Sequence, residues 1–317
     1  MSAQVGSNPT DHQSPDQYDD EIDLRELFSV LWAGKIKIIA ITVVFAVASV
    51  IYALSVPNQY KATALLAPAQ SDGGGLSGAL GQMGGLASLA GISLGGGESG
   101  EAQIAQEIMK SWSYIEGFIA ENNIAVEVYA AEGWNKGSNT LKINSDVYDA
   151  EANEWLVKDE AGAARSPSSW VLFKAFKKKL SVSEDKKSGL VSVSIEYYSP
   201  LIAKQWVDLY VESINRFMQQ RQVDKVTRNI AYLQEQVGKT SIAEMQEVFY
   251  SIIEEQTKNK MLAEASPDYA FLAVGPSMVP EQKSQPKRAL ICILGTLLGG
   301  MLSLLLVLVT HYARKSD

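Results

Sequence analysis

The chain has 317 residues, 46% of them hydrophobic, and a formal net charge of −8 at pH 7. Its one cysteine, Cys292, lies in an apolar run and its two histidines, His12 and His311, lie in the terminal tails, which excludes a disulfide framework and a histidine-centred catalytic or metal site between them. The mildly acidic central region argues against nucleic-acid binding, which needs lysine and arginine to neutralise phosphates. We therefore expect no cofactor, no metal and no nucleic-acid partner.

The first 34 residues form an acidic tail, with seven carboxylates against Arg25 alone. This acidic composition is typical of a solvated, disordered segment. Binding of a partner by this tail is the alternative interpretation.

Two apolar runs, residues 35–56 and 289–310, have the length of about 20 residues that a bilayer core requires. The first begins too far from the start of the chain for a cleaved signal peptide. Both runs are therefore predicted to be transmembrane helices.

Basic residues set the expected orientation of these two spans. Lys35 and Lys37 precede the first span, whereas Lys61 alone follows it closely, so the positive-inside rule places the N-terminus in the cytoplasm. The second span then returns residues 311–317 to the cytoplasm, and residues 57–288 form a domain on the far side.

The second span contains closely spaced glycines. Gly295 and Gly299 have small-xxx-small spacing and Gly300 is adjacent, a pattern that lets another helix approach closely. Ordinary glycine content of membrane helices is the alternative. Helix association is the prediction in either case.

The external domain is predicted to begin with a base, residues 57–199, whose first element is a strand over residues 60–67. A glycine-rich stretch at residues 73–100 follows, and it contains a formal GxGxxG match at Gly73, Gly75 and Gly78. Nucleotide binding is not expected, because that motif must open a helix straight after a strand. A flexible or oligomer-facing loop is predicted instead.

Helical periodicity returns at residues 102–122 and, for a shorter helix, at residues 170–180. Residues 124–168 have no clear period and are predicted to be loops with short elements. Period-two alternation on both sides of residues 185–189 predicts an antiparallel hairpin.

Residues 200–265 are predicted to form long helices. Ser199 followed by Pro200 is a helix-start signature, and apolar residues keep helical spacing to Val237 before a second helix over residues 242–265. We expect a strut that projects from the base or packs against other copies, with a kink near Gln220 as the alternative.

Two aromatic residues of the first long helix, Trp206 and Tyr210, could contact sugar, but burial in a helix interface is the favoured interpretation. Residues 266–288 include Pro276, Pro280 and Pro286 and are predicted to form a stiff extended tether to the second span.

At both ends the chain resembles the Wzz polysaccharide chain-length determinants. The N-terminal resemblance lies in Glu-Ile-Asp-Leu-Arg-Glu-Leu-Phe at residues 21–28, Leu-Trp at 31–32 and Pro-Asn-Gln-Tyr-Lys-Ala at 57–62. The C-terminal resemblance lies in the proline-rich stretch from residue 276 to 291 and in the glycines that follow it. The matching motif and assembly residues are Pro276, Pro280, Pro286, Lys287, Gly295, Gly299 and Gly300.

This resemblance implies an α+β membrane protein in which two transmembrane helices flank a periplasmic α/β base with a long helical extension. It further implies a homo-oligomeric ring in the cell inner membrane that regulates the chain length of O-antigen or a related glycan together with a Wzy-type polymerase. The nascent polysaccharide is a further candidate contact. The alternative is a membrane adaptor that partners a separate tyrosine kinase or export machinery.

An enzymatic role is not expected. The carboxylates are scattered, and Glu254 and Glu255 are adjacent on a predicted helix, so they point in different directions and make a poor acid/base pair. A glycosidase built from two well-placed carboxylates is the remaining catalytic alternative.

Overall fold

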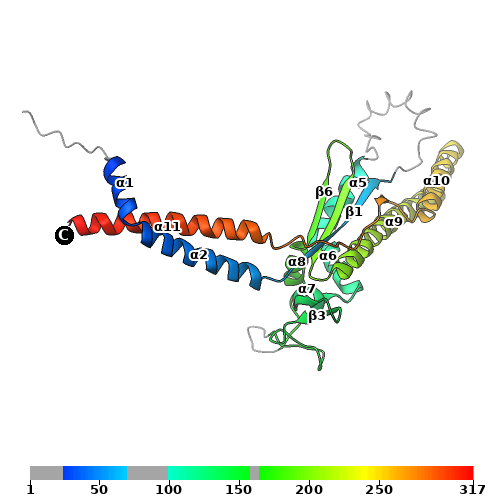
Figure 1. The fold of residues 1–317 in the computed structure, drawn as a ribbon. Coiled ribbons are helices and arrows are strands. Elements are labelled where there is room, and N and C mark those ends of the chain that lie inside the picture. Colours follow the sequence, from blue (N-terminus) through cyan, green and yellow to red (C-terminus); the bar gives the residue numbers. More distant parts are fainter. Residues whose placement is uncertain (1–23, 70–98, 158–163, 317) are drawn as a thin grey trace, which may run out of the picture. The chain divides into compact units, whose positions relative to one another are not determined.

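The computed structural model describes residues 24–69, 99–157 and 164–316 (Figure 1). The chain divides into two compact units, one made of Met1–Ser55 with Lys287–Asp317 and the other of Val56–Pro286. Residues 1–23 of the predicted acidic tail and most of the glycine-rich stretch, with its GxGxxG match, lie outside the described residues. Residues 24–33 belong to the same predicted tail but form a helix, so the prediction of a disordered segment is wrong there.

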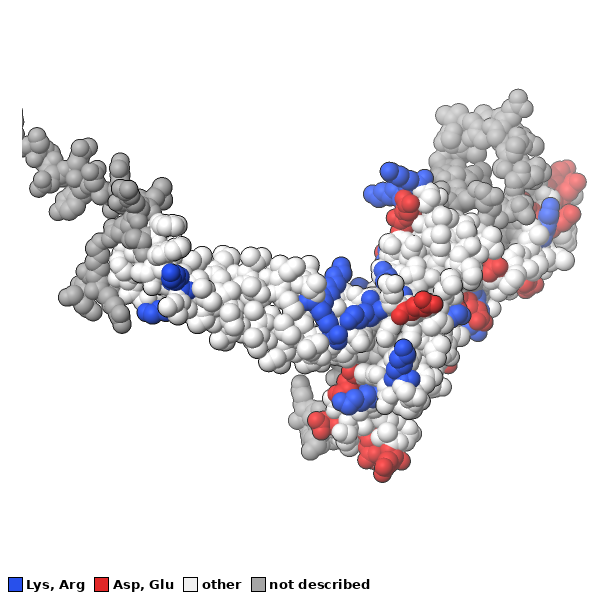
Figure 2. All heavy atoms as spheres, viewed as in Figure 1, with Lys and Arg blue, Asp and Glu red and all other residues white. Residues whose placement is uncertain are grey.

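The described residues of the first unit form the helices α1 (Leu24–Ala33), α2 (Lys35–Ser55) and α11 (Arg288–Ser316). By length and composition α2 and residues Arg288–Ala313 of α11 could each cross a membrane, as the two apolar runs predict. Most of their side chains are exposed, and Figure 2 shows the visible face of the pair as a largely uncharged surface.

The second unit is built on a four-stranded antiparallel sheet with the order β6-β7-β1-β8. Its strands are β1 (Tyr60–Pro68), β6 (Leu180–Glu184), β7 (Val191–Tyr197) and β8 (Phe271–Gly275). The predicted first strand and the predicted hairpin are both present. The hairpin turns through Gly189, whose φ of 69° is one that glycine adopts without steric cost.

Strand β8 corrects the prediction that residues 266–288 form only a tether. It pairs with β1, where Pro68 lies opposite Phe271 and Leu65 opposite Gly275. Phe271 is fully buried but Leu272 and Val274 are exposed. Buried and exposed residues therefore do not alternate along β8. The strand with which it pairs lies about 200 residues away in the sequence, so no local pattern indicates the pairing.

Helices α5 (Ser99–Lys110), α6 (Trp112–Glu121) and α8 (Ser169–Lys177) form the core with the sheet. The pattern at residues 102–122 predicts a single helix, and this is wrong, because Ser111 ends α5 and caps α6. The break shifts the helical phase, which leaves Ile104 and Trp112 47% and 43% exposed.

Short elements fill the region between α6 and α8, as predicted. They are α7 (Ala125–Tyr129) and two small hairpins, one made of β2 (Ala131–Asn135) with β3 (Thr140–Ile143) and the other of β4 (Tyr148–Asp149) with β5 (Glu154–Trp155).

Helix α9 (Pro200–Lys239) runs for 40 residues and contacts α10 (Ala243–Glu264) (Figure 1). Ser199 caps its first turn by accepting a hydrogen bond from the backbone N–H of Ile202, which confirms the predicted start. The helix is continuous through Gln220, so it is not divided there. Gln219 donates to the carbonyls of Ala263 and Ser266 and ties α9 to the end of α10.

Trp206 and Tyr210 lie in the core, in agreement with the favoured interpretation. Tyr210 donates to the carbonyl of Met109, and Tyr114 donates to the carbonyl of Tyr210. Burial raises the pKa of both tyrosine hydroxyls above the usual value, so they remain protonated donors. These side chains stabilise the base and are not available to a ligand.

Asn215, on α9, holds the start of β8. Its side chain is 3% exposed. The Oδ1 atom accepts hydrogen bonds from the backbone N–H groups of Ala270, at 3.0 Å, and Phe271, at 2.8 Å. The Nδ2 atom donates to the carbonyl of Phe271 at 2.8 Å. One side chain thus satisfies three buried backbone groups, which would each be costly if unpaired.

We predict that Asn215→Leu releases β8. Loss of these hydrogen bonds should lower the free energy of local opening by about 2–4 kcal/mol. Hydrogen exchange with mass spectrometry on the full chain should show faster exchange at residues 268–275. Arg216→Leu, which places a leucine at an exposed neighbouring position, is the control, and equal exchange in both variants would contradict the assignment.

Candidate functional site

Two glycines of the second apolar helix lie where α11 meets α2. A Cβ atom built at Gly295 would lie 2.5 Å from the Cβ of Ser49, and one built at Gly299 would lie 2.4 Å from the Cβ of Phe45. Real Cβ atoms do not approach so closely, so only glycine permits this separation of the helices. The small-xxx-small pattern therefore serves contact within one chain.

The same helix contact includes a polar pair and a third glycine. The hydroxyls of Thr42 and Ser303 lie 3.5 Å apart, and Ser303 is fully buried. At the junction of α1 and α2, a Cβ on Gly34 would lie 2.5 Å from a methyl group of Val307. Gly34 is isolated in the sequence, so no spacing pattern could have identified it.

Gly300 has a different environment from its neighbour. A Cβ atom built there meets nothing within 4 Å. Of the three glycines singled out in the second span, two pack against α2 and Gly300 leaves a small, open surface on α11.

The proline-rich segment after β8 is extended and is held by side chains of α9 and β7. Ser277 donates to Asp208 of α9, and Ser284 donates to Glu196 of β7. Among the prolines, Pro276 is exposed, Pro280 is partly buried and Pro286 is buried. The segment ends at Pro286, and the exposed Lys287 begins the second segment of the other unit.

The end of this segment pairs with the beginning of the unit. The backbone N–H of Gln59 donates to the carbonyl of Gln285 at 3.0 Å, and the N–H of Ser284 donates to the carbonyl of Gln59 at 2.8 Å. Gln59 and Gln285 thus form an antiparallel bridge beyond the end of β1. The entry and the exit of the Val56–Pro286 unit therefore lie side by side.

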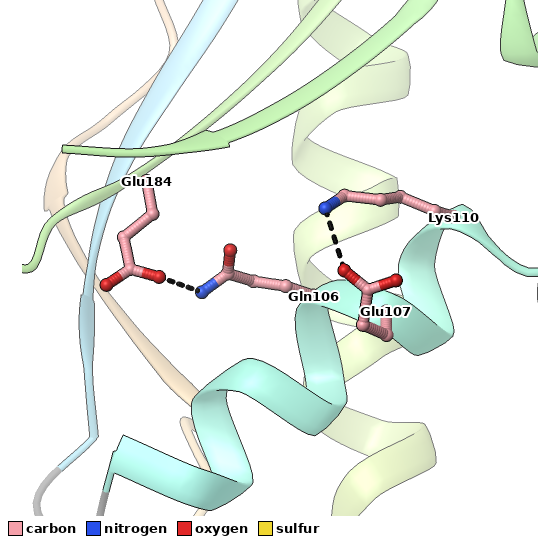
Figure 3. Close-up of polar contacts among 4 residues, drawn as sticks. All are labelled: Gln106, Glu107, Lys110 and Glu184. Carbon is pink, nitrogen blue, oxygen red and sulfur yellow. Dashed lines mark hydrogen bonds and ion pairs between the residues drawn. The ribbon is translucent and has the colours of Figure 1, made fainter. Parts of the chain in front are cut away.

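A polar contact joins α5 to the outer strand of the sheet (Figure 3). The Nε2 atom of the buried Gln106 donates to Oε2 of Glu184 on β6 at 3.0 Å, while Lys110 and Glu107 form a separate ion pair along α5 at 3.1 Å. An amide cannot exchange protons with a carboxylate at ordinary pH, so the Gln106–Glu184 contact positions α5 and offers no acid/base pair.

A cavity of about 570 Å³ lies between α6, α7, the start of α8 and the β4–β5 hairpin. Its lining combines two aromatic rings with a carboxylate, amides and a hydroxyl, and no sequence motif indicated it. Glu116, Asn123, Tyr148, Asn153, Trp155 and Ser169 are its polar and aromatic residues. Across the described residues, no group of three or more His, Cys, Asp or Glu side chains is arranged to hold a metal ion.

We predict that Gly299→Leu separates α2 from α11. The added side chain would overlap Phe45, and overpacking of this kind costs about 1–3 kcal/mol. The midpoint of thermal denaturation of the full chain in detergent should fall. Gly300→Leu adds the same group to an open surface and should change the midpoint little; a midpoint for Gly299→Leu equal to that of the unsubstituted protein would contradict the close contact.

Comparison with known proteins gives a match to one family model and likenesses to solved structures, two of which are described below. A family model described as Wzz, chain length determinant protein, matches residues 20–122. No curated protein sequence matches the chain.

The structural likenesses are to a full-length bacterial polysaccharide co-polymerase and to a fragment of WzzB, a polysaccharide co-polymerase from Salmonella Typhimurium. The first is 16% identical with a TM-score of 0.38, over 93% of this chain and 99% of that one. The second is 12% identical with a TM-score of 0.30, over 72% and 100% of the two chains. The resemblance to the Wzz chain length determinants is thus confirmed by the sequence model, which matches the first apolar helix, β1, α5 and α6.

Proposed function

We propose that this protein is a polysaccharide co-polymerase that regulates the chain length of a surface glycan, O-antigen or a related polymer, and does not itself catalyse polymerisation. The observation that carries this proposal is the match of residues 20–122 to the chain length determinant model. The placement of an α+β unit between two helices long enough to cross a membrane supports it.

In the proposed arrangement α2 and α11 cross the cell inner membrane, both termini are cytoplasmic and residues 57–288 are periplasmic. Lys35 and Lys37 at the start of α2, with Arg314 and Lys315 after the second apolar run, support this orientation. The base then comprises residues 57–199, the helical extension residues 200–265 and the tether residues 266–288.

The protein acts as a homo-oligomeric ring with a Wzy-type polymerase, and the nascent polysaccharide is a further contact. Exposed apolar side chains on the helical extension support association through this region, because burying large apolar groups between copies is favourable. They include Tyr232 on α9 and Val248, Tyr250 and Met261 on α10.

The motif residues divide between two tasks in this proposal. Gly295 and Gly299 hold α2 against α11, and Gly300 offers a close approach to another copy. The path from the base to the second span is fixed by Pro276, Pro280, Pro286 and Lys287. Changes in the base can then reach the membrane helices through an ordered segment.

A deletion strain tests the proposed function. Surface polysaccharide separated on a gel should lose its modal band when the gene is deleted and regain it when the gene is restored. The chain with Gly299→Leu should restore the band poorly. An unchanged length distribution in the deletion strain would contradict the proposal, and loss of all polymer would favour an adaptor for a separate tyrosine kinase or for export machinery.

A further inference from the structure

The cavity between α6, α7, α8 and the β4–β5 hairpin has the size and lining of a small-molecule site. Its volume of about 570 Å³ falls within the range of about 300–1,000 Å³ that ligand pockets span. None of the motif residues lies in it, and the core aromatic residues Trp206 and Tyr210 are not among its lining residues. The polar and aromatic lining of the cavity is therefore explained neither by the family motif nor by the packing of the core.

One wall of the cavity is an aromatic ring with a fixed orientation. Trp155 packs against Tyr148 with the ring centres 5.0 Å apart and against Tyr129 at 6.3 Å. The Tyr148 hydroxyl donates to Oδ1 of Asn153, which also lines the cavity. An indole held in this way offers a rigid apolar face with little loss of side-chain entropy on binding.

Two asparagines reach the cavity from positions that favour glycine. Asn123 follows the end of α6 with φ of 51°, in the hydrogen-bond pattern of a Schellman motif, and Asn153 turns the β4–β5 hairpin with φ of 57°. Glycine adopts this backbone conformation at lower cost. Each position instead supplies an amide, which can both donate and accept hydrogen bonds, to one cavity.

The charge of the cavity restricts the ligand. Glu116 is the charged side chain among the described lining residues, and Ser169 adds a hydroxyl at the first turn of α8. A carboxylate accepts hydrogen bonds from hydroxyl or amide groups and repels an anion. An aromatic face, amides, a hydroxyl and one carboxylate together suit a polyhydroxylated ring of neutral charge.

We propose that this cavity binds neutral or N-acetylated pyranose units. The C–H face of the sugar packs on Trp155, while Asn123, Asn153 and Glu116 bind its hydroxyl or acetamido groups. The identification of such a sugar with a unit of the regulated polysaccharide rests on the proposed function. The cavity then lets the base contact the growing chain directly.

Binding is tested by saturation-transfer NMR and calorimetry on the full chain in detergent, with chitotriose, maltotriose and trigalacturonate as probes. Chitotriose or maltotriose should bind and trigalacturonate should not. Asn123→Gly should weaken binding about three- to tenfold, the loss expected for a hydrogen bond. Its denaturation midpoint should stay constant or rise, because glycine suits the positive φ.

Two further variants separate the roles of the lining residues. Trp155→Ala should weaken binding about tenfold or more, whereas Trp170→Ala, which removes an exposed indole outside the cavity lining, should leave it unchanged. Glu116→Gln should admit trigalacturonate. Failure of all three probes to bind, or equal binding by Asn123→Gly and Trp170→Ala, would overturn the proposal.

The same strains distinguish this inference from the proposed function. A modal band that depends on the gene, in a protein that binds none of the probes, overturns the sugar site alone. Sugar binding that Asn123→Gly weakens, in a strain whose polysaccharide length does not depend on the gene, overturns the proposed function alone and leaves the site standing.

Discussion

The antiparallel pairing of β1 with β8, continued by the bridge between Gln59 and Gln285, is the contact on which the closure of the Val56–Pro286 unit depends. It joins the beginning and the end of a unit of more than two hundred residues. Because Ser55 and Lys287 are covalent neighbours of that unit, the same pairing brings the two connections to α2 and α11 together. This strand pairing therefore lets the ends of α2 and α11 meet, although a large domain separates the two helices in the sequence.

This closure depends on side chains that act over long sequence distances. Asn215 satisfies the backbone at the start of β8 from α9, and Ser277 and Ser284 hold the proline segment against Asp208 and Glu196. Proline removes backbone donors and limits rotation, so these few hydroxyl contacts are enough to define the path of the segment. The tether is an ordered part of the base and not a free spacer.

The contact between α2 and α11 depends on different residues. In the proposed membrane setting the hydrophobic effect would not drive two apolar helices together, so contact would depend on close backbone approach. Gly295, Gly299 and Gly34 supply that approach at three points, facing Ser49, Phe45 and Val307. The cavity beside Trp155 belongs to neither feature, and its lining residues are free of both tasks.

Features with a local pattern were predictable from the sequence. The apolar spans, the hairpin around Gly189 and the capped start of α9 each depend on neighbouring residues, and all are present. Strand β8 was not predictable, because its pairing partner is distant and its exposed face is apolar. The division at Ser111 was hidden by apolar spacing that continues across it.

The candidate site was likewise predictable only where the sequence has a local pattern. The spacing of Gly295 and Gly299 predicted a helix contact but not its partner, which is α2 of the same chain. Gly34, Asn123 and Asn153 gave no signal, since a lone glycine and scattered asparagines are common in any sequence. Their importance lies in positive φ angles and in close contacts that only the folded chain creates.

The most direct test of a periplasmic unit closed at Gln59 and Gln285 is the thiol state of a double cysteine variant in cells. Residues opposed in a hydrogen-bonded antiparallel pair lie about 5.5 Å apart at Cα, within the range for a disulfide. With Cys292→Ser, the chain carrying Gln59→Cys and Gln285→Cys should form an intrachain disulfide in the oxidising periplasm. Free thiols at both positions in intact cells would contradict the closure, the periplasmic location or both, and oxidation of the purified protein would show which.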